Sequence, residues 1–150
     1  MKLSLEQREE EEIEVTIKYC TMNADVRMLV RKVESCSHTV FGDDNGRQFR
    51  INIYNIYYIE SVDKKTFIYT KDQVFRTERK LYQFAEELKS YDFVQVSKSC
   101  ILNLEVLKHI RNLHNSRMEA TLINEEKVTV SRTYLPAIKD ALSKEVNADD

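Results

Sequence analysis

The N-terminal part of the chain shows two different patterns of apolar residues in succession. Between residues 13 and 20 apolar and polar residues alternate, which is the period of a strand. Between residues 24 and 35 the apolar residues recur at helical spacing, and Asn23 precedes them as a candidate helix cap. One strand and one helix cannot bury their apolar faces alone. We therefore expect residues 1–37 to form a short strand-helix extension that packs on the rest of the chain or on another subunit.

Short strands joined by tight turns are predicted for the middle of the chain. The sequence DDNG at residues 43–46 favours a hairpin, because Asn-Gly readily adopts the positive φ values that a tight turn needs. Strand-like stretches, HTVF and RQFRINI, flank it on both sides. Further stretches rich in β-branched and aromatic residues follow at residues 54–61, 66–70 and 73–78.

The rest of the chain adds strands and two helices. Residues 81–91 carry apolar residues on one helical face and charged residues on the other. Pro136 suits the first turn of a short terminal helix from Tyr134 to Leu142. Strands are predicted at residues 93–103, 106–113, 117–123 and 127–131. The pattern indicates a mainly β fold with minor α content.

Composition narrows the class of protein. A chain of 150 residues with 42% hydrophobic residues can form one domain, or one domain with a small appendage. Only 2 glycines are present, which excludes a Gly-rich nucleotide loop. No apolar run approaches the ~20 residues that span a membrane, and the N-terminus has no apolar signal core. We expect a cytoplasmic protein whose 3 cysteines form no disulfide framework.

Charge is distributed unevenly along the chain. Residues 38–142 have a net charge of +2, whereas residues 1–37 and 143–150 each have −2. Cations stand among hydroxyl side chains in three connecting stretches, at residues 61–66, 97–99 and 131–134. Such groups bind phosphates and base edges, but solubilising loop polarity is the simpler interpretation of the pattern alone.

No catalytic constellation is visible in the sequence. The histidines fall in different predicted segments, and no metal-ligand or phosphate-loop motif is present. A hydrolase using Ser131 or Cys100 would need a base that the sequence does not show. We therefore expect no enzyme activity, no metal, no cofactor and no small-molecule substrate.

Four stretches, taken in their order and spacing, resemble a LytTR-type DNA-binding domain over residues 49–142. They are IYYIESVDKKTFIYT, LYQFAEEL, FVQVSKSCILNLEVLKHI and KVTVSRTYLPAIKDAL. The resemblance implies an elongated, antiparallel, stacked-sheet domain of a transcriptional regulator, mostly bacterial. In that family loops, and not a recognition helix, enter successive major grooves.

Carried over position by position, the resemblance assigns DNA binding to the three cationic stretches. Arg132 is the strongest candidate, because Arg can bind guanine O6 and N7 with two hydrogen bonds. We expect Asn103 to be structural, and residues 124–126 depart from the Asn-Gly turn that relatives often carry. The DNA-binding residues implied are Lys64, Lys65, Thr66, Ser97, Lys98, Ser99 and Arg132.

The predicted organisation is an extension (1–37), a LytTR-type domain (38–146) and an acidic tail (147–150). The residues before the domain are too few for the receiver domain that most relatives carry. Expected partners are double-stranded DNA, a second copy in a homodimer and a regulatory membrane protein that contacts residues 13–36. The alternative for residues 13–36 is that they extend the β domain or pair two subunits. The alternative function is a protein-interaction module that has lost DNA binding.

Overall fold

A seven-stranded antiparallel sheet forms the centre of the computed structural model, which describes residues 1–9 and 12–147. Its strand order is β2-β1-β5-β4-β3-β7-β6. The strands are β1 (Thr39–Asp44), β2 (Arg47–Asn52), β3 (Tyr58–Val62), β4 (Lys65–Tyr69), β5 (Val74–Thr77), β6 (Phe93–Ser97) and β7 (Cys100–Asn103). Most of the expected acidic tail, from residue 148 onward, lies outside the described residues.

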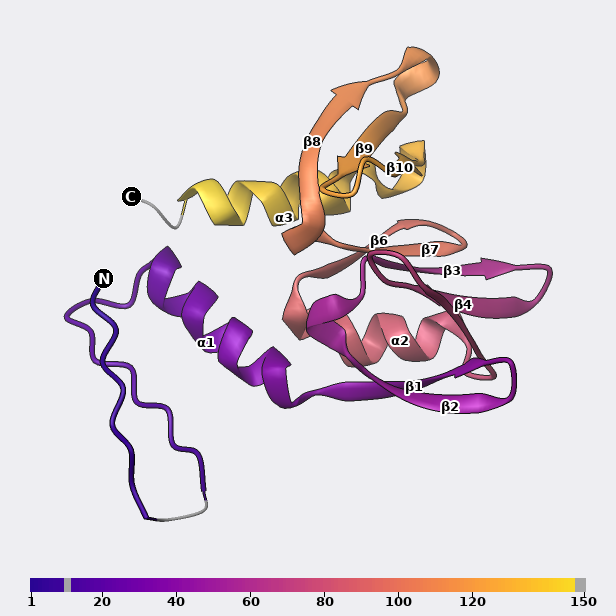
Figure 1. Cartoon of the computed structure of the whole chain (residues 1–150). Coiled ribbons are helices and arrows are strands. Elements are labelled where there is room, and N and C mark those ends of the chain that lie inside the picture. Colours follow the sequence, from indigo (N-terminus) through magenta and orange to yellow (C-terminus); the bar gives the residue numbers. More distant parts are fainter. Residues whose placement is uncertain (10–11, 148–150) are drawn as a thin grey trace.

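A smaller three-stranded sheet and three helices complete the fold. The sheet has the order β10-β9-β8, with β8 (Leu107–Asn112), β9 (Met118–Leu122) and β10 (Lys127–Val130). The helices are α1 (Ala24–Ser37), α2 (Leu81–Leu88) and α3 (Leu135–Asn147). In Figure 1, α2 lies between the β1–β2 hairpin and β3, whereas α3 and the smaller sheet lie on the other side of β6 and β7. The expected mainly antiparallel β architecture is confirmed.

Strand β7 is covered on both faces because it separates two hydrophobic cores. Ile101 belongs to the core beneath α2, together with Ile59, Phe84 and Leu88. The neighbouring Leu102 points the other way, into the core of the smaller sheet and α3. Both side chains are at most 1% exposed. This double burial explains the unbroken apolar run CIL in the sequence, since neither face of the strand meets water.

The predicted strand at residues 13–20 is not formed. These residues lie outside every helix and strand, and Ile13 is 90% exposed. Alternation favours a strand only where a neighbouring strand can supply hydrogen bonds, and among the described residues no strand pairs with this segment. The prediction of a helix at 24–35 is confirmed, with the side chain of Asn23 accepting a hydrogen bond from the Val26 amide.

Two other expected strands are interrupted. The strand expected at 54–61 begins only at Tyr58, because residues 53–55 form a 3-10 turn that the Asn52 side chain caps. The strand expected at 93–103 is two strands, β6 and β7, that form a hairpin across Lys98 and Ser99. The DDNG turn is as predicted, with positive φ at Asn45 (53°) and Gly46 (83°).

Asn103 has the structural role that the sequence predicts. It is 3% exposed, and its Nδ2 donates to the Ile56 carbonyl at 2.8 Å. Its Oδ1 accepts from the Glu105 amide at 3.0 Å. A buried side chain with both polar atoms satisfied fixes the backbone where β7 ends.

Side chains near the C-terminal end of α1 anchor this helix to the β domain. Arg31 forms an ion pair with Asp92 at 3.1 Å, and Nδ2 of Asn52 donates to the Cys36 carbonyl at 2.6 Å. His38, which follows the helix, binds Glu87 of α2 with a distance of 2.8 Å between Nε2 and Oε1. No helix in the described part of the chain is long and apolar enough to cross a membrane.

We expect Ile101→Ala and Leu102→Ala each to lower the free energy of unfolding by about 2–5 kcal/mol, because each leaves a cavity in one core. Urea denaturation should show one cooperative transition for both variants, since β7 joins the cores. Val62→Ala, at a 43% exposed position, is the matched control with a small effect. Two separate transitions in either core variant would contradict the coupling.

We expect Glu87→Gln to lower stability at neutral pH by about 1 kcal/mol. Partial burial acts to raise the pKa of Glu87, but hydrogen bonds and charges from Arg79 and His38 outweigh it and hold the pKa below its ordinary value. A carboxyl with a lowered pKa stabilises the fold above its unfolded-state pKa, and this contribution is lost as pH falls through the lowered value.

Urea denaturation as a function of pH checks this prediction. The difference in the free energy of unfolding between wild type and Glu87→Gln should become smaller as the pH falls below the ordinary pKa range of a carboxyl group. Glu86→Gln is the control, because its side chain is 76% exposed and pairs with the exposed surface residue Lys89. If this difference in the free energy of unfolding stayed constant down to acid pH, the negative charge of Glu87 would not be the cause of the stabilisation.

Candidate nucleic-acid interface

Three connections that are far apart in sequence lie at one end of the domain. The β3–β4 and β6–β7 hairpins point the same way because β3 and β7 pair antiparallel, with Glu60 opposite Cys100. A hydrogen bond of 2.8 Å from the Ser61 amide to the Ser99 carbonyl joins the two hairpins. The Ser131 amide donates to the Val96 carbonyl at 2.8 Å, which holds the third connection beside β6. Figure 1 shows both hairpins and the start of α3 at this end.

The β3–β4 hairpin presents two lysines on a constrained turn. Asp63 and Lys64 both have left-handed φ values, 50° and 64°, although neither is glycine. Such a conformation costs free energy and is frequent at functional sites. Lys64 and Lys65 are exposed. Thr66, which the resemblance also implies for DNA binding, is only 3% exposed, so its side chain lies inside the hairpin.

The β6–β7 hairpin holds Lys98 between two serines that bind each other. Ser97 Oγ accepts from the Ser99 amide at 3.2 Å and lies 3.4 Å from Ser99 Oγ. Gln95 Nε2 donates to the Ser97 carbonyl at 3.1 Å. Lys98 is exposed, whereas both serines are half-buried. The serines therefore shape the turn, and Lys98 is the group of this hairpin that extends into solvent.

Arg132 lies in the third connection, in a 3-10 turn (Arg132–Tyr134) directly before α3. The amide of Tyr134 donates to the Ser131 carbonyl at 3.0 Å and closes this turn. Arg132 is exposed, and its backbone is fixed through Ser131 to β6 on one side and through α3 on the other. This arrangement gives a long, cationic side chain a rigid base.

The four exposed cations of the three connections have no acidic partners among the described residues. Among the described residues, no carboxylate oxygen lies within 4.0 Å of Lys64, Lys65, Lys98 or Arg132, whereas Arg111 elsewhere is paired at 2.9 Å. Unpaired cations on rigid loops can neutralise phosphates, and an Arg can also bind a guanine edge.

Sequence reasoning missed Arg117. It follows the β8–β9 turn and is exposed, and it precedes Met118, which pairs with Val130 at the end of β10. This register places Arg117 next to Ser131 and hence beside the third connection. No motif marks the residue, and only the strand pairing brings it beside the third connection.

Other candidate chemistry is not supported by the geometry. Burial raises the pKa of the Cys100 thiol to about 12, so it carries no thiolate at neutral pH. In the described part of the chain, no three His, Cys, Asp or Glu side chains are placed to hold a metal ion.

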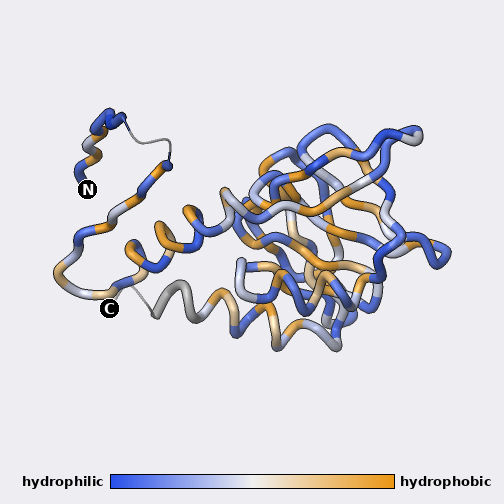
Figure 2. The backbone as a smooth tube through the Cα atoms, turned by 90° about the horizontal axis from the view of Figure 1, so that it is seen from below, coloured by the Kyte–Doolittle hydropathy of each residue, from blue (hydrophilic) through white to orange (hydrophobic). Residues whose placement is uncertain are grey.

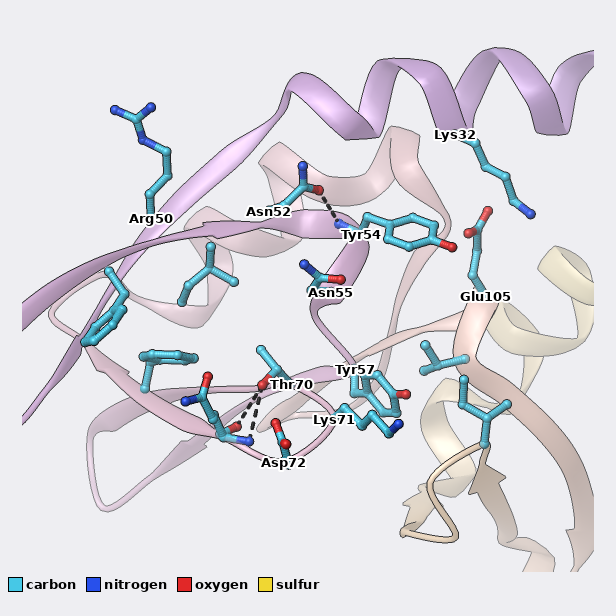
Figure 3. Close-up of a pocket in the computed structure, with 16 residues that line it drawn as sticks. Lys32, Arg50, Asn52, Tyr54, Asn55, Tyr57, Thr70, Lys71, Asp72 and Glu105 are labelled. Atoms are coloured by element: carbon cyan, nitrogen blue, oxygen red, sulfur yellow. Dashed lines mark hydrogen bonds between the residues drawn. The ribbon is translucent and has the colours of Figure 1, made fainter.

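A cavity of about 530 Å³ lies at the opposite end of the large sheet, near the β4–β5 turn (Figure 3). Its lining includes four aromatic side chains, Phe49, Tyr54, Tyr57 and Phe75. Several polar side chains of the cavity form hydrogen bonds with backbone groups. The side chain of Asn52, for example, accepts a hydrogen bond from the Tyr54 amide at 2.9 Å. The cavity is therefore separate from the cationic loops.

Comparison with known proteins gives a consistent result. Two Staphylococcus aureus proteins, both described as uncharacterized HTH-type transcriptional regulators, are each 27% identical to this chain. The protein of strain MW2 aligns over 95% of this chain and 99% of its own length, and that of strain NCTC 8325 / PS 47 over 81% and 84%. Among the described residues no two helices form a helix-turn-helix, since strands β6 to β10 separate α2 from α3.

The fold has a solved counterpart. The LytTr DNA-binding domain of a Bacillus cereus protein superposes with a TM-score of 0.66 at 23% identity, over 69% of this chain and 95% of that domain. The family model described as the LytTr DNA-binding domain matches residues 46–143, which include all three cationic connections. The chain therefore belongs to the LytTr DNA-binding domain family.

Proposed function

We propose that this protein is a sequence-specific DNA-binding transcriptional regulator that inserts loops into the major groove of DNA. The observation that carries the proposal is the meeting of three distant connections at one end of the domain, each with an exposed cation that has no carboxylate partner among the described residues. Family membership and relatives described as transcriptional regulators support it.

Different roles follow from how each cation is held. Arg132 extends from a backbone fixed on both sides, which suits the defined geometry of two hydrogen bonds to one guanine. Lys64 and Lys65 lie at a hairpin tip, and a flexible ammonium group suits phosphates better than base edges. Lys98 can serve either purpose. Ser97 and Ser99 position Lys98 in the β6–β7 hairpin. Thr66 supports the β3–β4 hairpin from the interior.

We further propose that two copies bind repeated half-sites. One domain neutralises few phosphates, and affinity for DNA scales with the number neutralised, so a single domain binds weakly. Residues 13–36 are the segment available for a partner, either a second copy or the regulatory membrane protein that the family resemblance suggests.

One observation favours a second function, that of a protein-interaction module without DNA binding. The whole chain has a net charge of −2, which weakens attraction to a polyanion. Local charge decides between the two functions, because the loops meet DNA first. A gel shift at low salt with the DNA upstream of the protein's own gene separates them, and the absence of any shift would favour the interaction module.

We expect Arg132→Ala to reduce binding to a cognate duplex more than binding to a scrambled one, by about 1–3 kcal/mol. Lys64→Ala and Lys65→Ala should weaken both duplexes similarly and reduce the salt dependence, because phosphate contacts carry no sequence information. The cognate duplex is first obtained by selection from random duplexes with wild-type protein, and affinities are then titrated at fixed salt.

Lys71→Ala is the matched control, because this exposed lysine lies in the β4–β5 turn at the opposite end of the sheet. Thermal unfolding of each variant excludes misfolding as the cause of a loss. Equal losses on both duplexes for Arg132→Ala would make this residue a phosphate contact. If Lys71→Ala lost as much affinity for DNA as Lys64→Ala, the three cationic connections would not be the DNA-binding surface.

A further inference from the structure

Helix α1 binds the β domain with its polar face. Arg31 pairs with Asp92 at 3.1 Å, and Ser35, one turn later, is only 8% exposed. At about 100° per residue, Val26 lies on the opposite side of the helix from Ser35. Leu29, Val30 and Val33 follow Val26 at helical spacing and share its side. The apolar stripe of α1 therefore lies on the side of the helix opposite Ser35, where Val26 is buried and Leu29 and Val30 are half-buried.

Part of this stripe is left uncovered. Val33 is 39% exposed, and Met22 just before the helix is 44% exposed. Val26 differs, because it is 7% exposed and so already buried within the chain. Figure 2 shows α1 projecting from the body of the molecule with apolar residues along it. A projecting helix with an apolar outer face is typical of an interface.

The stripe has the spacing of a coiled-coil seam. Counting Val26 and Val33 as a positions makes Met22 and Leu29 d positions, so the separations alternate between four and three residues. Asp25 and Lys32 then occupy equivalent flanking positions, each directly before an a residue. Flanking charges decide which helix orientation pairs well.

We propose that α1 forms an antiparallel pair with α1 of a second copy of this chain. In one register, Asp25 meets Lys32 of the partner subunit, and two-fold symmetry makes this contact twice. The same register packs the exposed Val33 against Met22 of the partner subunit. A parallel pair would place Asp25 beside Val30 of the partner subunit and gains no ion pair. Charge complementarity thus selects a second copy in antiparallel orientation.

This inference rests on the homodimer in the proposed function, but it does not need DNA. The helix is anchored at its C-terminal end by Arg31 and Cys36, and the cationic loops lie at the other end of the sheet. Pairing through the outer face of α1 therefore leaves those loops accessible.

Sedimentation of the full chain without DNA, over a wide concentration range, tests the pairing. Asp25→Lys and Lys32→Glu should each weaken the dimer by about tenfold, because each places like charges together twice. The double variant Asp25→Lys/Lys32→Glu should restore it. Asp25 also stabilises the first turn of α1, but that loss persists in the double variant, so recovery reports contact between subunits.

An apolar pair of variants gives an independent readout. Val33→Asp should dissociate the dimer, whereas Val74→Asp, at a 49% exposed position on β5, should not. Circular dichroism checks that α1 remains folded. A wild-type chain that is monomeric at every concentration, including one in which its own N-terminal segment covers the stripe, would overturn the proposal.

Failure of the double variant to recover would also overturn it, because the antiparallel register requires recovery. A dimer that behaves as expected in a protein that shifts no DNA would instead count against the proposed function and leave the α1 pairing supported. The two proposals can therefore fail separately.

Discussion

Burial of β7 on both faces is the constraint on which the rest of the domain depends. Ile101 and Leu102 are neighbours in sequence but belong to different cores, so the strand holds the large sheet and the smaller sheet together. Its pairing with β3 also sets the direction of two hairpins. The cationic loops are close together because this one strand is fixed from both sides.

The sequence predicts the elements of the fold well where local chemistry decides them. Asn23 caps α1, and Asn45-Gly46 forms the expected turn. The strand predicted at residues 13–20 from alternating apolar and polar residues was wrong, because a strand needs a neighbouring strand and the pattern does not say whether one exists. The apolar run from 93 to 103 hid a hairpin, because Lys98 and Ser99 turn without glycine or proline.

The candidate site was predictable in part. The family resemblance predicts Lys64, Lys98 and Arg132 as DNA-binding residues, and the structure brings their loops to one end. The burial of Thr66 was not predictable, because exposure depends on which face of β4 meets the core and the resemblance does not report this. The position of Arg117 could not be predicted from the sequence, since only the register of β9 against β10 places it beside Ser131.

The direct junction between α1 and the sheet makes the length of this helix a geometric parameter. Ser37 ends α1 and Thr39 begins β1, so a single residue connects them. Inserting one residue into α1 would rotate everything before it by about 100° and displace it by about 1.5 Å relative to the sheet. Insertions of nearly whole turns preserve the rotational phase, and others do not. The length of helix α1 therefore sets both the distance and the angle between the residues before it and the sheet.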